Sequence, residues 1–375
     1  MKILFISYHF HPSNLVGAKR VSYWAKNLEK FSKRKIHTSL VTTQNEALNQ
    51  NPEIDNIFIV EPVKELSQFR IDAGSEWYYN LKPFLLNHLQ NSSYDYCIIT
   101  GNPFGHFLII KELKRFKIKT LLDFRDPFAV NPRSRFTLKS KVKSILLSFL
   151  EYYFIANTHK SIVVNKYCIE HIRFRRFLTE KIEIIDNGFD ETILYNTQTK
   201  ELNTRRNQIS LAYSGSIFKD RDPKNLIKVI QQYSDSLEFH LIGNINNIYK
   251  AKNVVLHGLL SYEENLKLLQ KKDILVVLAT GHQFESSTKV FDYIALKKPI
   301  MVIFNEWQGK GALFDILNTY PLAVFSKNTI EDIEISIDKI INSIDAFESK
   351  IVDYDVSKFS RKNGLLTLLN LLNED

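Results

Sequence analysis

Short apolar runs alternate with longer amphipathic segments along most of this chain. The amphipathic segments carry apolar residues three and four positions apart, as at Val21, Trp24 and Leu28, which predicts helices with one buried face. The runs are almost continuously apolar, which is typical of strands in a parallel sheet covered on both faces. Predicted strands cover residues 2–7, 37–43, 56–60, 94–100, 120–124, 161–165 and 182–185, then 209–213, 237–242, 254–257, 274–278, 300–304 and 322–325.

A stretch without periodicity separates the two groups of strands. Residues 197–206, TQTKELNTRR, have the character of a linker. The 375-residue chain also exceeds the ~250–300 residues at which single cores stop growing. We therefore expect an α/β protein with two Rossmann-like, doubly wound domains at 1–196 and 207–355 and a final helical segment at 356–375. Ligands bind beyond the carboxyl ends of such strands, so we expect the ligand in a cleft between facing domains.

Composition excludes several classes of protein. The chain is 44% hydrophobic and 24% charged, which is typical of a globular protein and not of a disordered one. Cys97 and Cys168 lack the spacing of a zinc site or a disulfide framework, which fits a reducing compartment. The first residues, MKILFISYHF, predict a strand and not a signal peptide. The longest apolar run, 144–156, is too short to span a bilayer and contains Glu151, so we expect a cytoplasmic protein.

The positive charge is confined to the first half of the chain. The net charge is +9, yet residues 1–190 hold 28 Lys and Arg against 18 Asp and Glu, whereas residues 191–375 hold 22 against 23. The excess positive charge has two interpretations. Either the lysines only keep the surface of the first domain solvated, or the first domain binds something anionic, such as a membrane surface or a charged acceptor. No nucleic-acid-binding motif accompanies the charge, so nucleic acid is not an expected partner.

Glycine is scarce, and its positions are informative. The chain has 12 glycines, where average usage of about 7% predicts roughly twice as many. Eight of them follow predicted strands, and Gly17, Gly215 and Gly281 are candidates for close approach to phosphate or sugar. No GxGxxG follows the first strand and no P-loop sequence occurs, which argues against dinucleotide and P-loop folds. His9 and His11 have no third ligand spaced to join them, so no metal site is expected.

Residues 284–300, FESSTKVFDYIALKKPI, form the most informative segment. Ser287 and Thr288 are N-cap residue types before an amphipathic helix, with Lys289 in its first turn and Asp292 about one turn further on. A helix N-terminus beside a lysine suits a diphosphate, and a carboxylate there can accept hydrogen bonds from ribose hydroxyls. The same pattern also describes a capped core helix with a surface lysine.

Several segments, in order, resemble glycosyltransferases of the family-4 type, which have the GT-B fold. They are MKILFISYHFHPSNLVGAKRVSYWAKNL at the start, LLDFRDP at 121–127, IIDNGFD at 184–190, AYSGSIFKDRDPKNL at 212–226, HGLLSYEENLKLLQKKDILVVL at 257–278 and STKVFDYIALKKPI at 287–300. The resemblance implies that the second domain binds a nucleotide sugar, the first binds the acceptor, and the last helix crosses back to the first domain. It also implies transfer to a glycan, lipid-linked or other hydroxyl acceptor with retention of configuration, without metal or other cofactor, typically in bacterial surface polysaccharide or glycoconjugate biosynthesis.

The resemblance further implies roles for single residues. Lys289 would hold the leaving diphosphate, helped by Lys219 or Arg221 after the turn at Gly215, and Asp292 matches the family's ribose-binding carboxylate. Gly17 and Arg20 would close on the diphosphate from the first domain. The donor-side candidates are Gly17, Arg20, Gly215, Ser216, Lys219, His282, Glu285, Ser287, Thr288 and Asp292, and the catalytic candidates are Asp126, Lys289 and Arg221.

One departure from the family concerns the donor sugar. Many members have a second glutamate eight positions before the ribose carboxylate, and here that position is Phe284, followed by Glu285. Either the loop is shifted by one residue, or the sugar is held differently, for example by His282. This departure supports the alternative of a non-catalytic subunit that binds a nucleotide sugar or glycan. A GT-B-fold sugar-nucleotide epimerase is a separate alternative. The sequence assigns neither the donor nor the acceptor.

Acceptor-side candidates follow strand ends in the first domain. Asp126 is in a position where family members often have a catalytic or acceptor-orienting residue, and a structural turn with Pro127 is the alternative. Arg125 adjoins it, and His106 is a further candidate that could equally cap the helix it opens. Residues 133–156, basic and then apolar, either dock peripherally on the inner face of a membrane or form an interior helix with a solvated basic end.

Overall fold

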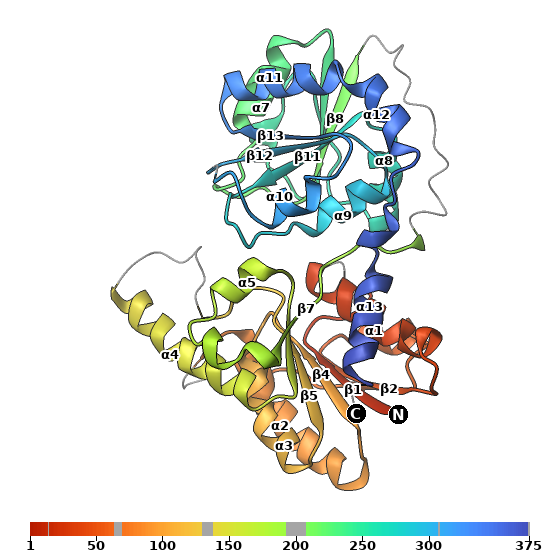
Figure 1. The fold of residues 1–375 in the computed structure, drawn as a ribbon, viewed down its shortest axis with the longest axis vertical. Coiled ribbons are helices and arrows are strands. Elements are labelled where there is room, and N and C mark those ends of the chain that lie inside the picture. Colours follow the sequence, from red (N-terminus) through yellow and green to blue (C-terminus); the bar gives the residue numbers. More distant parts are fainter. Residues whose placement is uncertain (14, 64–69, 130–137, 193–207, 307, 374–375) are drawn as a thin grey trace. The chain divides into compact units, whose positions relative to one another are not determined.

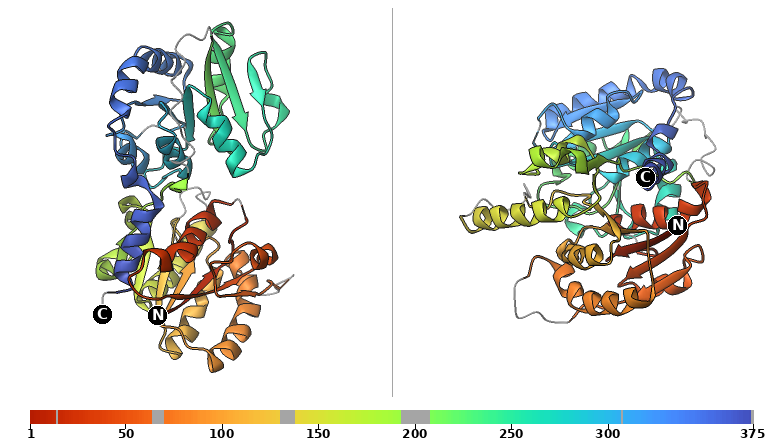
Figure 2. Two further views of the ribbon diagram at one scale, coloured as in Figure 1. Left: turned by 90° about the vertical axis from the view of Figure 1, so that its right-hand side faces the viewer. Right: turned by 60° about the horizontal axis from the view of Figure 1, so that its bottom comes forward.

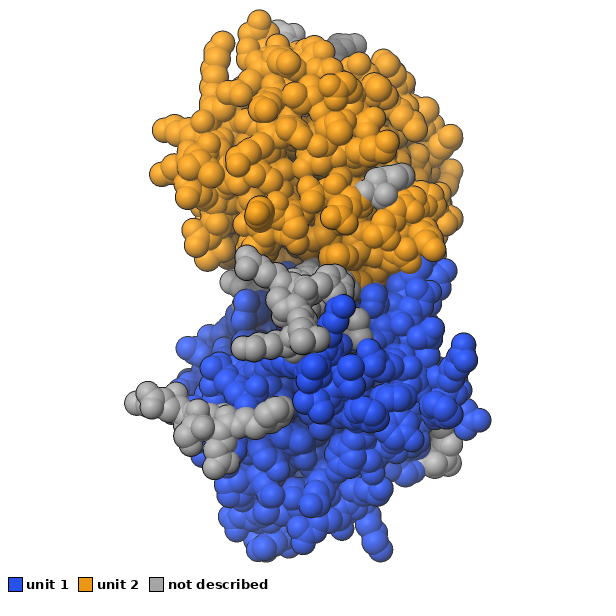
Figure 3. All heavy atoms as spheres, turned by 90° about the vertical axis from the view of Figure 1, so that its left-hand side faces the viewer, with its two compact units in different colours: residues 1–187, 361–375 blue, residues 188–360 orange. Residues whose placement is uncertain are grey.

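The chain forms two compact units (Figure 3), each described below by itself. The computed structural model describes residues 1–375 except 14, 64–69, 130–137, 193–207, 307 and 374–375. Unit 1 is Met1–Asn187 with Arg361–Asp375, and unit 2 is Gly188–Ser360. The first boundary thus precedes the predicted linker at 197–206, which lies outside the described residues. The chain returns to unit 1 at Arg361 and not at the predicted residue 356.

Unit 1 is built on a seven-stranded parallel sheet in the order β3-β2-β1-β4-β5-β6-β7. Its strands are β1 (Lys2–Ser7), β2 (His37–Thr42), β3 (Asn56–Ile59), β4 (Tyr96–Thr100), β5 (Lys119–Asp123), β6 (Lys160–Val163) and β7 (Ile182–Ile184). The helices described between them are α1 (Val16–Phe31), α2 (Ala73–Asn91), α3 (Ile110–Arg115), α4 (Leu138–Ala156) and α5 (Lys166–Glu170).

Unit 2 is built on a six-stranded parallel sheet in the order β10-β9-β8-β11-β12-β13. Its strands are β8 (Ile209–Ser214), β9 (Leu237–Ile242), β10 (Val254–Leu256), β11 (Ile274–Ala279), β12 (Ile300–Phe304) and β13 (Ala323–Lys327). The α-helices among its described residues are α7 (Lys224–Gln232), α8 (Tyr262–Gln270), α9 (Thr288–Ala295), α10 (Ala312–Leu317), α11 (Ile330–Ile341) and α12 (Ile344–Ile351). Figure 1 shows α7 and α11 on one side of this sheet and α9 and α10 on the other.

The predicted α/β class and all the predicted strands are confirmed. The cause is visible in β1, where five consecutive residues are buried between the flanking strands β2 and β4. A strand covered on both faces is apolar at most positions, and such runs are easily recognised in a sequence. Because the strands of each sheet are parallel, their carboxyl ends share one edge, and the loops at that edge carry the candidate residues.

The last helix, α13 (Arg361–Leu371), packs on unit 1 as predicted. Its leucines Leu365, Leu368 and Leu369 join the same hydrophobic cluster as Val21 and Trp24 of α1. The helix therefore completes the core of the first unit, although it follows the second unit in sequence. None of the described helices is both long and apolar enough to cross a membrane.

Candidate functional site

The turn after β8 brings Gly215 against the ammonium group of Lys289. Gly215 has φ +139°, a conformation that favours glycine, and a Cβ atom there would overlap Lys289 Nζ. Lys289 lies in the first turn of α9, and its Nζ donates a hydrogen bond of 3.3 Å to the Tyr213 hydroxyl. The same nitrogen lies 4.5 Å from the centroid of the Tyr213 ring. The fold thus joins the glycine and the lysine that the sequence singled out separately.

Tyr213 is a member of this site that the sequence did not indicate. It is buried at the end of β8, and burial raises its pKa to about 12, so the hydroxyl stays protonated at neutral pH. The hydroxyl donates to the carbonyl of Ser216 at 2.8 Å, which fixes the turn that carries the exposed Ser216 and Lys219. A lone buried tyrosine in an apolar strand gives no functional signal in a sequence, so only the fold identifies it.

Arg221 is held by a buried carboxylate, Glu285. Arg221 Nη2 lies 2.5 Å from Glu285 Oε1, and Glu285 is 5% exposed. The second oxygen, Oε2, accepts hydrogen bonds from the Thr280 backbone N–H at 2.9 Å and from its hydroxyl at 2.5 Å. Both carboxylate oxygens are therefore engaged within unit 2. Arg221 Nε has no hydrogen-bond partner among the described residues, so the guanidinium keeps donor capacity for a ligand.

The first turn of α9 is not capped by a side chain. Ser287 occupies the N-cap position with φ −60° and ψ 122°, but no hydrogen bond from its side chain caps the helix, although its residue type predicted one. Thr288 begins the helix. The first backbone N–H groups of a helix need partners from outside it, and an anion can supply them. This geometry suits phosphate binding more closely than the capped core helix that the sequence left open.

Asp292 lies on the same helix and faces α8. It is 7% exposed, and its Oδ1 accepts a hydrogen bond of 2.9 Å from the Tyr262 hydroxyl. Tyr262 is the first residue of α8 and carries no functional signal in the sequence. The tyrosine orients the carboxylate that the resemblance assigns to ribose.

The loop before α9 places an aromatic stack where the family has its second glutamate. Phe284 is 6% exposed, and its ring stacks on His282 with centroids 5.6 Å apart and an interplanar angle of 13°. Gly281 has φ +100°, and a Cβ atom there would overlap the Glu306 carbonyl. His282 therefore lies half-buried over a buried phenylalanine, at the same loop whose Glu285 turns towards Arg221.

In unit 1, Gly17 lies beside Arg125 and His9. A Cβ atom on Gly17 would lie 2.9 Å from Arg125 Nη1 and 3.7 Å from the His9 ring. Arg125 has φ +37°, and its Nε has no hydrogen-bond partner among the described residues. Burial, followed by the charge of Arg125, lowers the pKa of His9. His9 is thus a neutral ring at this strand edge that sequence analysis considered only as a metal ligand.

The structure buries Arg20, which the resemblance placed at the diphosphate. Arg20 is 5% exposed, and its Nη1 donates to the Ile185 carbonyl at 2.8 Å. Its Nη2 lies 3.3 Å from Asp123 Oδ1, and its guanidinium lies 4.3 Å above the Trp24 ring. A guanidinium with these partners holds unit 1 together. The structure therefore gives no support to direct contact between Arg20 and a ligand.

His106 is also an interior residue. It lies in the short 3₁₀ helix Gly105–Ile109 and is fully buried, and burial lowers its pKa to about 3. Its Nε2 lies 3.1 Å from the Thr100 carbonyl, so the neutral ring carries its proton on Nε2 and donates it there. A buried His106 with this partner fits neither of its two predicted roles, as a helix cap or as a residue in direct contact with the acceptor.

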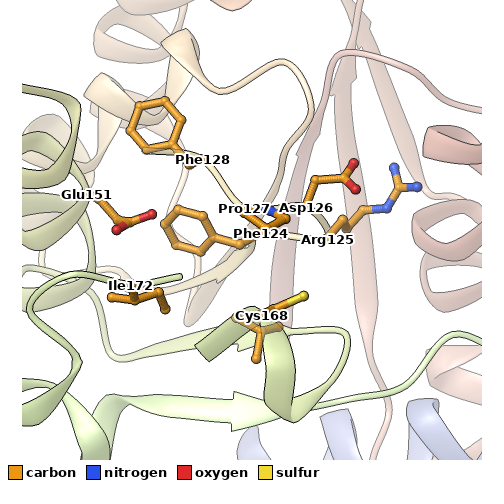
Figure 4. Close-up of a pocket in the computed structure, with 9 residues that line it drawn as sticks. Phe124, Arg125, Asp126, Pro127, Phe128, Glu151, Cys168 and Ile172 are labelled. Atoms are coloured by element: carbon orange, nitrogen blue, oxygen red, sulfur yellow. The ribbon is translucent and has the colours of Figure 1, made fainter. Parts of the chain in front are cut away.

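Asp126 lies at the rim of a small pocket in unit 1 (Figure 4). The pocket is lined by Phe124, Arg125, Asp126, Pro127, Phe128, Glu151, Val163, Cys168 and Ile172. Its space is about that of one water molecule. Asp126 is exposed, and its backbone N–H donates to the Phe124 carbonyl in a tight turn. In Figure 4, Glu151 lies on one side of Phe124, whereas Asp126 and Arg125 lie on the other.

Glu151 is the buried acid of this pocket. It is 2% exposed, and its Oε1 accepts a hydrogen bond of 3.3 Å from the Ala129 N–H. Its Oε2 has no hydrogen-bond partner within the described part of the chain. Burial raises the pKa of Glu151 from 4.5 to about 8, so the folded protein holds this carboxyl protonated at neutral pH.

Replacing Glu151 by glutamine should reduce the pH dependence of stability. Between pH 4.5 and about 8 the folded chain keeps a proton that the unfolded chain has released, so wild-type stability falls as the pH rises through this window. The slope is at most about 1.4 kcal/mol per pH unit. Glutamine has no such proton. Urea unfolding of both proteins at about pH 5, 6 and 7 measures the difference, and equal slopes would contradict the assignment.

Among the described residues, no three His, Cys, Asp or Glu side chains are grouped to hold a metal ion. No protein-family model and no curated protein matches the sequence. Several solved structures match over the whole chain at 12–13% identity.

Sucrose-phosphate synthase from Thermosynechococcus elongatus superposes with a TM-score of 0.71 at 13% identity, covering 100% of this chain and 98% of its own. HepE of Anabaena, in complex with UDP-glucose, gives a TM-score of 0.65 at 13% identity and full coverage of both chains. UDP-GlcNAc 2-epimerase from Neisseria meningitidis, bound to UDP-GlcNAc, gives a TM-score of 0.63 at 12% identity and full coverage of both chains. At such identities the likeness shows the fold, and this chain has the GT-B fold found in nucleotide-sugar glycosyltransferases.

Proposed function

We propose that the chain is a glycosyltransferase that moves a sugar from a nucleotide-sugar donor to a hydroxyl acceptor. The observation that supports it most is the cationic cluster of unit 2, where Lys289 lies over the Gly215 turn and Glu285 holds Arg221. These two cations, with the uncapped first turn of α9, suit the diphosphate of such a donor. Solved neighbours carrying UDP-glucose and UDP-GlcNAc agree with a nucleotide sugar as the ligand.

The proposed chemistry follows from charge. The bond between the anomeric carbon and the phosphate oxygen breaks, and the nucleoside diphosphate leaves with an added negative charge. The acceptor oxygen bonds to the anomeric carbon on the face that the diphosphate leaves, with retention and without a metal ion. The acceptor hydroxyl passes its proton to Asp126 or to the departing diphosphate. Lys289 and Arg221 favour the transition state over the ground state because the negative charge on the diphosphate grows as the bond breaks.

The remaining donor-side residues take supporting roles in this proposal. Asp292, oriented by Tyr262, accepts hydrogen bonds from the ribose hydroxyls. The exposed Ser216 and Lys219 contact the diphosphate from the turn after β8. His282, stacked on Phe284, contacts the donor sugar in place of the family's glutamate.

Unit 1 supplies the acceptor side in this proposal. Asp126 is exposed after β5 and orients or deprotonates the acceptor hydroxyl, with Arg125, Gly17 and His9 along the same edge. Cleavage of the donor requires no side chain from His106 or Arg20, which are buried. We further propose that the acceptor is a glycan or lipid-linked molecule of bacterial surface polysaccharide or glycoconjugate biosynthesis, handled by a cytoplasmic protein at a membrane surface.

Thermal-shift screening of nucleotide sugars tests the donor site. A donor that binds only the folded state raises the melting temperature as its concentration rises. At a concentration a hundredfold above Kd, it raises the free energy of unfolding by about 2.7 kcal/mol. We expect at least one nucleoside diphosphate sugar to do so in the wild type and to lose most of the shift in Lys289→Ala. Absence of any shift across donors of all common bases would contradict the proposal.

A sugar-nucleotide epimerase remains the second candidate. The buried Phe284 at the family's glutamate position, together with the epimerase among the structural neighbours, favours it. Incubation with UDP-GlcNAc alone, followed by NMR of the product, separates the two activities. A transferase releases UDP by slow hydrolysis, whereas an epimerase returns an isomeric UDP-sugar. A bound but unchanged donor would instead favour the non-catalytic binding subunit.

A further inference from the structure

Helix α4 of unit 1 presents a stripe of large apolar side chains to solvent. Its members are Val142, Ile145, Leu146, Phe149, Tyr152 and Tyr153, and all are exposed. Leu146 is 60% exposed and Phe149 is 57% exposed. At 3.6 residues per turn, the six positions span roughly 120° of the helix circumference, so they form one continuous face. We call this face the α4 stripe.

The opposite face of α4 is also apolar and already fills the core of unit 1. Phe154 and Ile155 are fully buried there, and the ring of Phe154 contacts those of Phe107 and Phe128 at 5.7 and 5.9 Å between centroids. Glu151 lies on this inner face. The sequence left open whether this segment is an interior helix or a docking helix. The structure shows a helix with one interior face and a second, surplus apolar face.

The stripe continues onto the segment after α5. The Phe174 ring lies 5.1 Å from that of Phe149 and 5.6 Å from that of Tyr152, measured between centroids. Three residues further on, in the 3₁₀ helix Arg175–Phe177, Phe177 is 78% exposed. Two segments that are separate in sequence therefore build one apolar surface. Figure 2 (right) shows α4 at the outer edge of unit 1.

Exposed basic residues border this surface at the start of α4 and in the segment after α5. Lys141 and Lys143 are exposed and lie on either side of the α4 stripe by helical position, and Arg173 and Arg176 are exposed beside Phe177. The only acidic residue of α4, Glu151, faces inward. The whole of unit 1 carries 30 Lys and Arg against 19 Asp and Glu, whereas unit 2 carries 20 against 22.

We propose that the α4 stripe and its basic rim dock unit 1 on the surface of a bilayer that contains anionic phospholipids. The apolar side chains enter the boundary between headgroups and acyl chains, where tyrosine is favoured, and the lysines and arginines contact lipid phosphates. The charge favours this occupant over a second copy of the chain, because two copies facing through this surface would bring their basic rims together. The proposal concerns binding and is independent of the transferase activity.

Vesicle co-sedimentation of the full chain tests it. The probes are vesicles of phosphatidylglycerol with phosphatidylethanolamine and vesicles of phosphatidylcholine alone. We expect binding to the anionic vesicles that weakens as salt rises, and little binding to the neutral ones. The variant Leu146→Glu/Phe149→Glu should reduce the partition coefficient at least tenfold, because two large apolar groups no longer enter the lipid. The variant Lys141→Glu/Lys143→Glu should also bind more weakly.

Matched control variants separate this surface from general effects. Leu259→Glu replaces an apolar residue that is 82% exposed in unit 2, and Lys33→Glu/Lys35→Glu reverses the same charge on an exposed loop of unit 1. Both should bind as the wild type does, and all variants replace exposed residues, so their melting temperatures should match. Three results would overturn the proposal: control variants that lose as much vesicle binding as the α4 variants, wild-type binding that is equally strong to neutral and anionic vesicles, or no wild-type binding to either. A wild-type dimer that Leu146→Glu/Phe149→Glu converts to a monomer would overturn it in favour of self-association.

Discussion

Lys289→Ala should lower kcat/KM for sugar transfer by about 10²–10³-fold, with a melting temperature close to that of the wild type. Removal of one preorganised donor at a developing negative charge typically costs about 2.7–4 kcal/mol of barrier. In unit 2 the ammonium lies over the Gly215 backbone and 3.3 Å from the Tyr213 hydroxyl, so it is positioned before any ligand binds. Alanine retains good helix propensity at this position in the first turn of α9.

Steady-state kinetics with the donor found by thermal-shift screening measure the effect. Lys228→Ala, an exposed lysine of α7 in the same unit, is the matched control and should leave kcat/KM unchanged. Lys289→Arg should recover part of the activity because it restores the charge, though with altered geometry at the crowded glycine turn. Wild-type kinetics in Lys289→Ala would remove the lysine from the mechanism.

Glu285→Ala should damage both stability and activity. Breaking a buried ion pair by removing one partner costs about 3–5 kcal/mol, because the other charge is left without compensation. We expect the lower end of this range, about 3 kcal/mol, because Arg221 is 18% exposed and water can reach it. Turnover should fall as well, since Arg221 loses the carboxylate oxygen that lies 2.5 Å from its Nη2 and fixes its direction.

A double-mutant cycle separates the two effects. Arg221→Ala/Glu285→Ala should be less destabilised than the sum of the single variants, because neither charge is then left unpaired. Glu285→Gln should be intermediate, since its single oxygen can serve Arg221 or Thr280 but not both. If the losses in unfolding free energy of the two single variants add up to that of the double variant in urea unfolding, the pair does not act as a unit. Unchanged kcat in Glu285→Ala would show that Arg221 needs no positioning.

The pair also bears on the departure at Phe284. Sequence spacing suggested either a loop shifted by one residue, with Glu285 reaching the donor sugar, or a different contact such as His282. The structure engages both oxygens of Glu285 with Arg221 and Thr280 and places His282 on Phe284. This geometry agrees with a positioning role for Glu285, whereas a sugar contact of His282 stays a prediction.

Some features of this molecule can be predicted from its sequence, whereas others are visible only in its tertiary structure. The strands were predictable because most of them lie in short, mainly apolar runs, and the parallel arrangement follows because such runs are buried on both faces. Gly215 and Lys289 were predictable as separate features, since a strand-end glycine and a first-turn lysine are local patterns. Their contact across two elements was not, because no local pattern encodes which distant side chain fills the space left by a missing Cβ.

The sequence by itself determined the α/β class, the positions of the strands, the confinement of positive charge to the first half and the identity of the segments at the strand ends. Tertiary structure alone decided which charged groups are buried and paired in the interior and which stay accessible. Arg20 and His106 are buried in unit 1, and Glu285 is committed to Arg221. It also decided that the α4 stripe points outward. The physical reason is that burial and ion pairing depend on neighbours brought together by folding, whereas apolar periodicity is a property of adjacent residues.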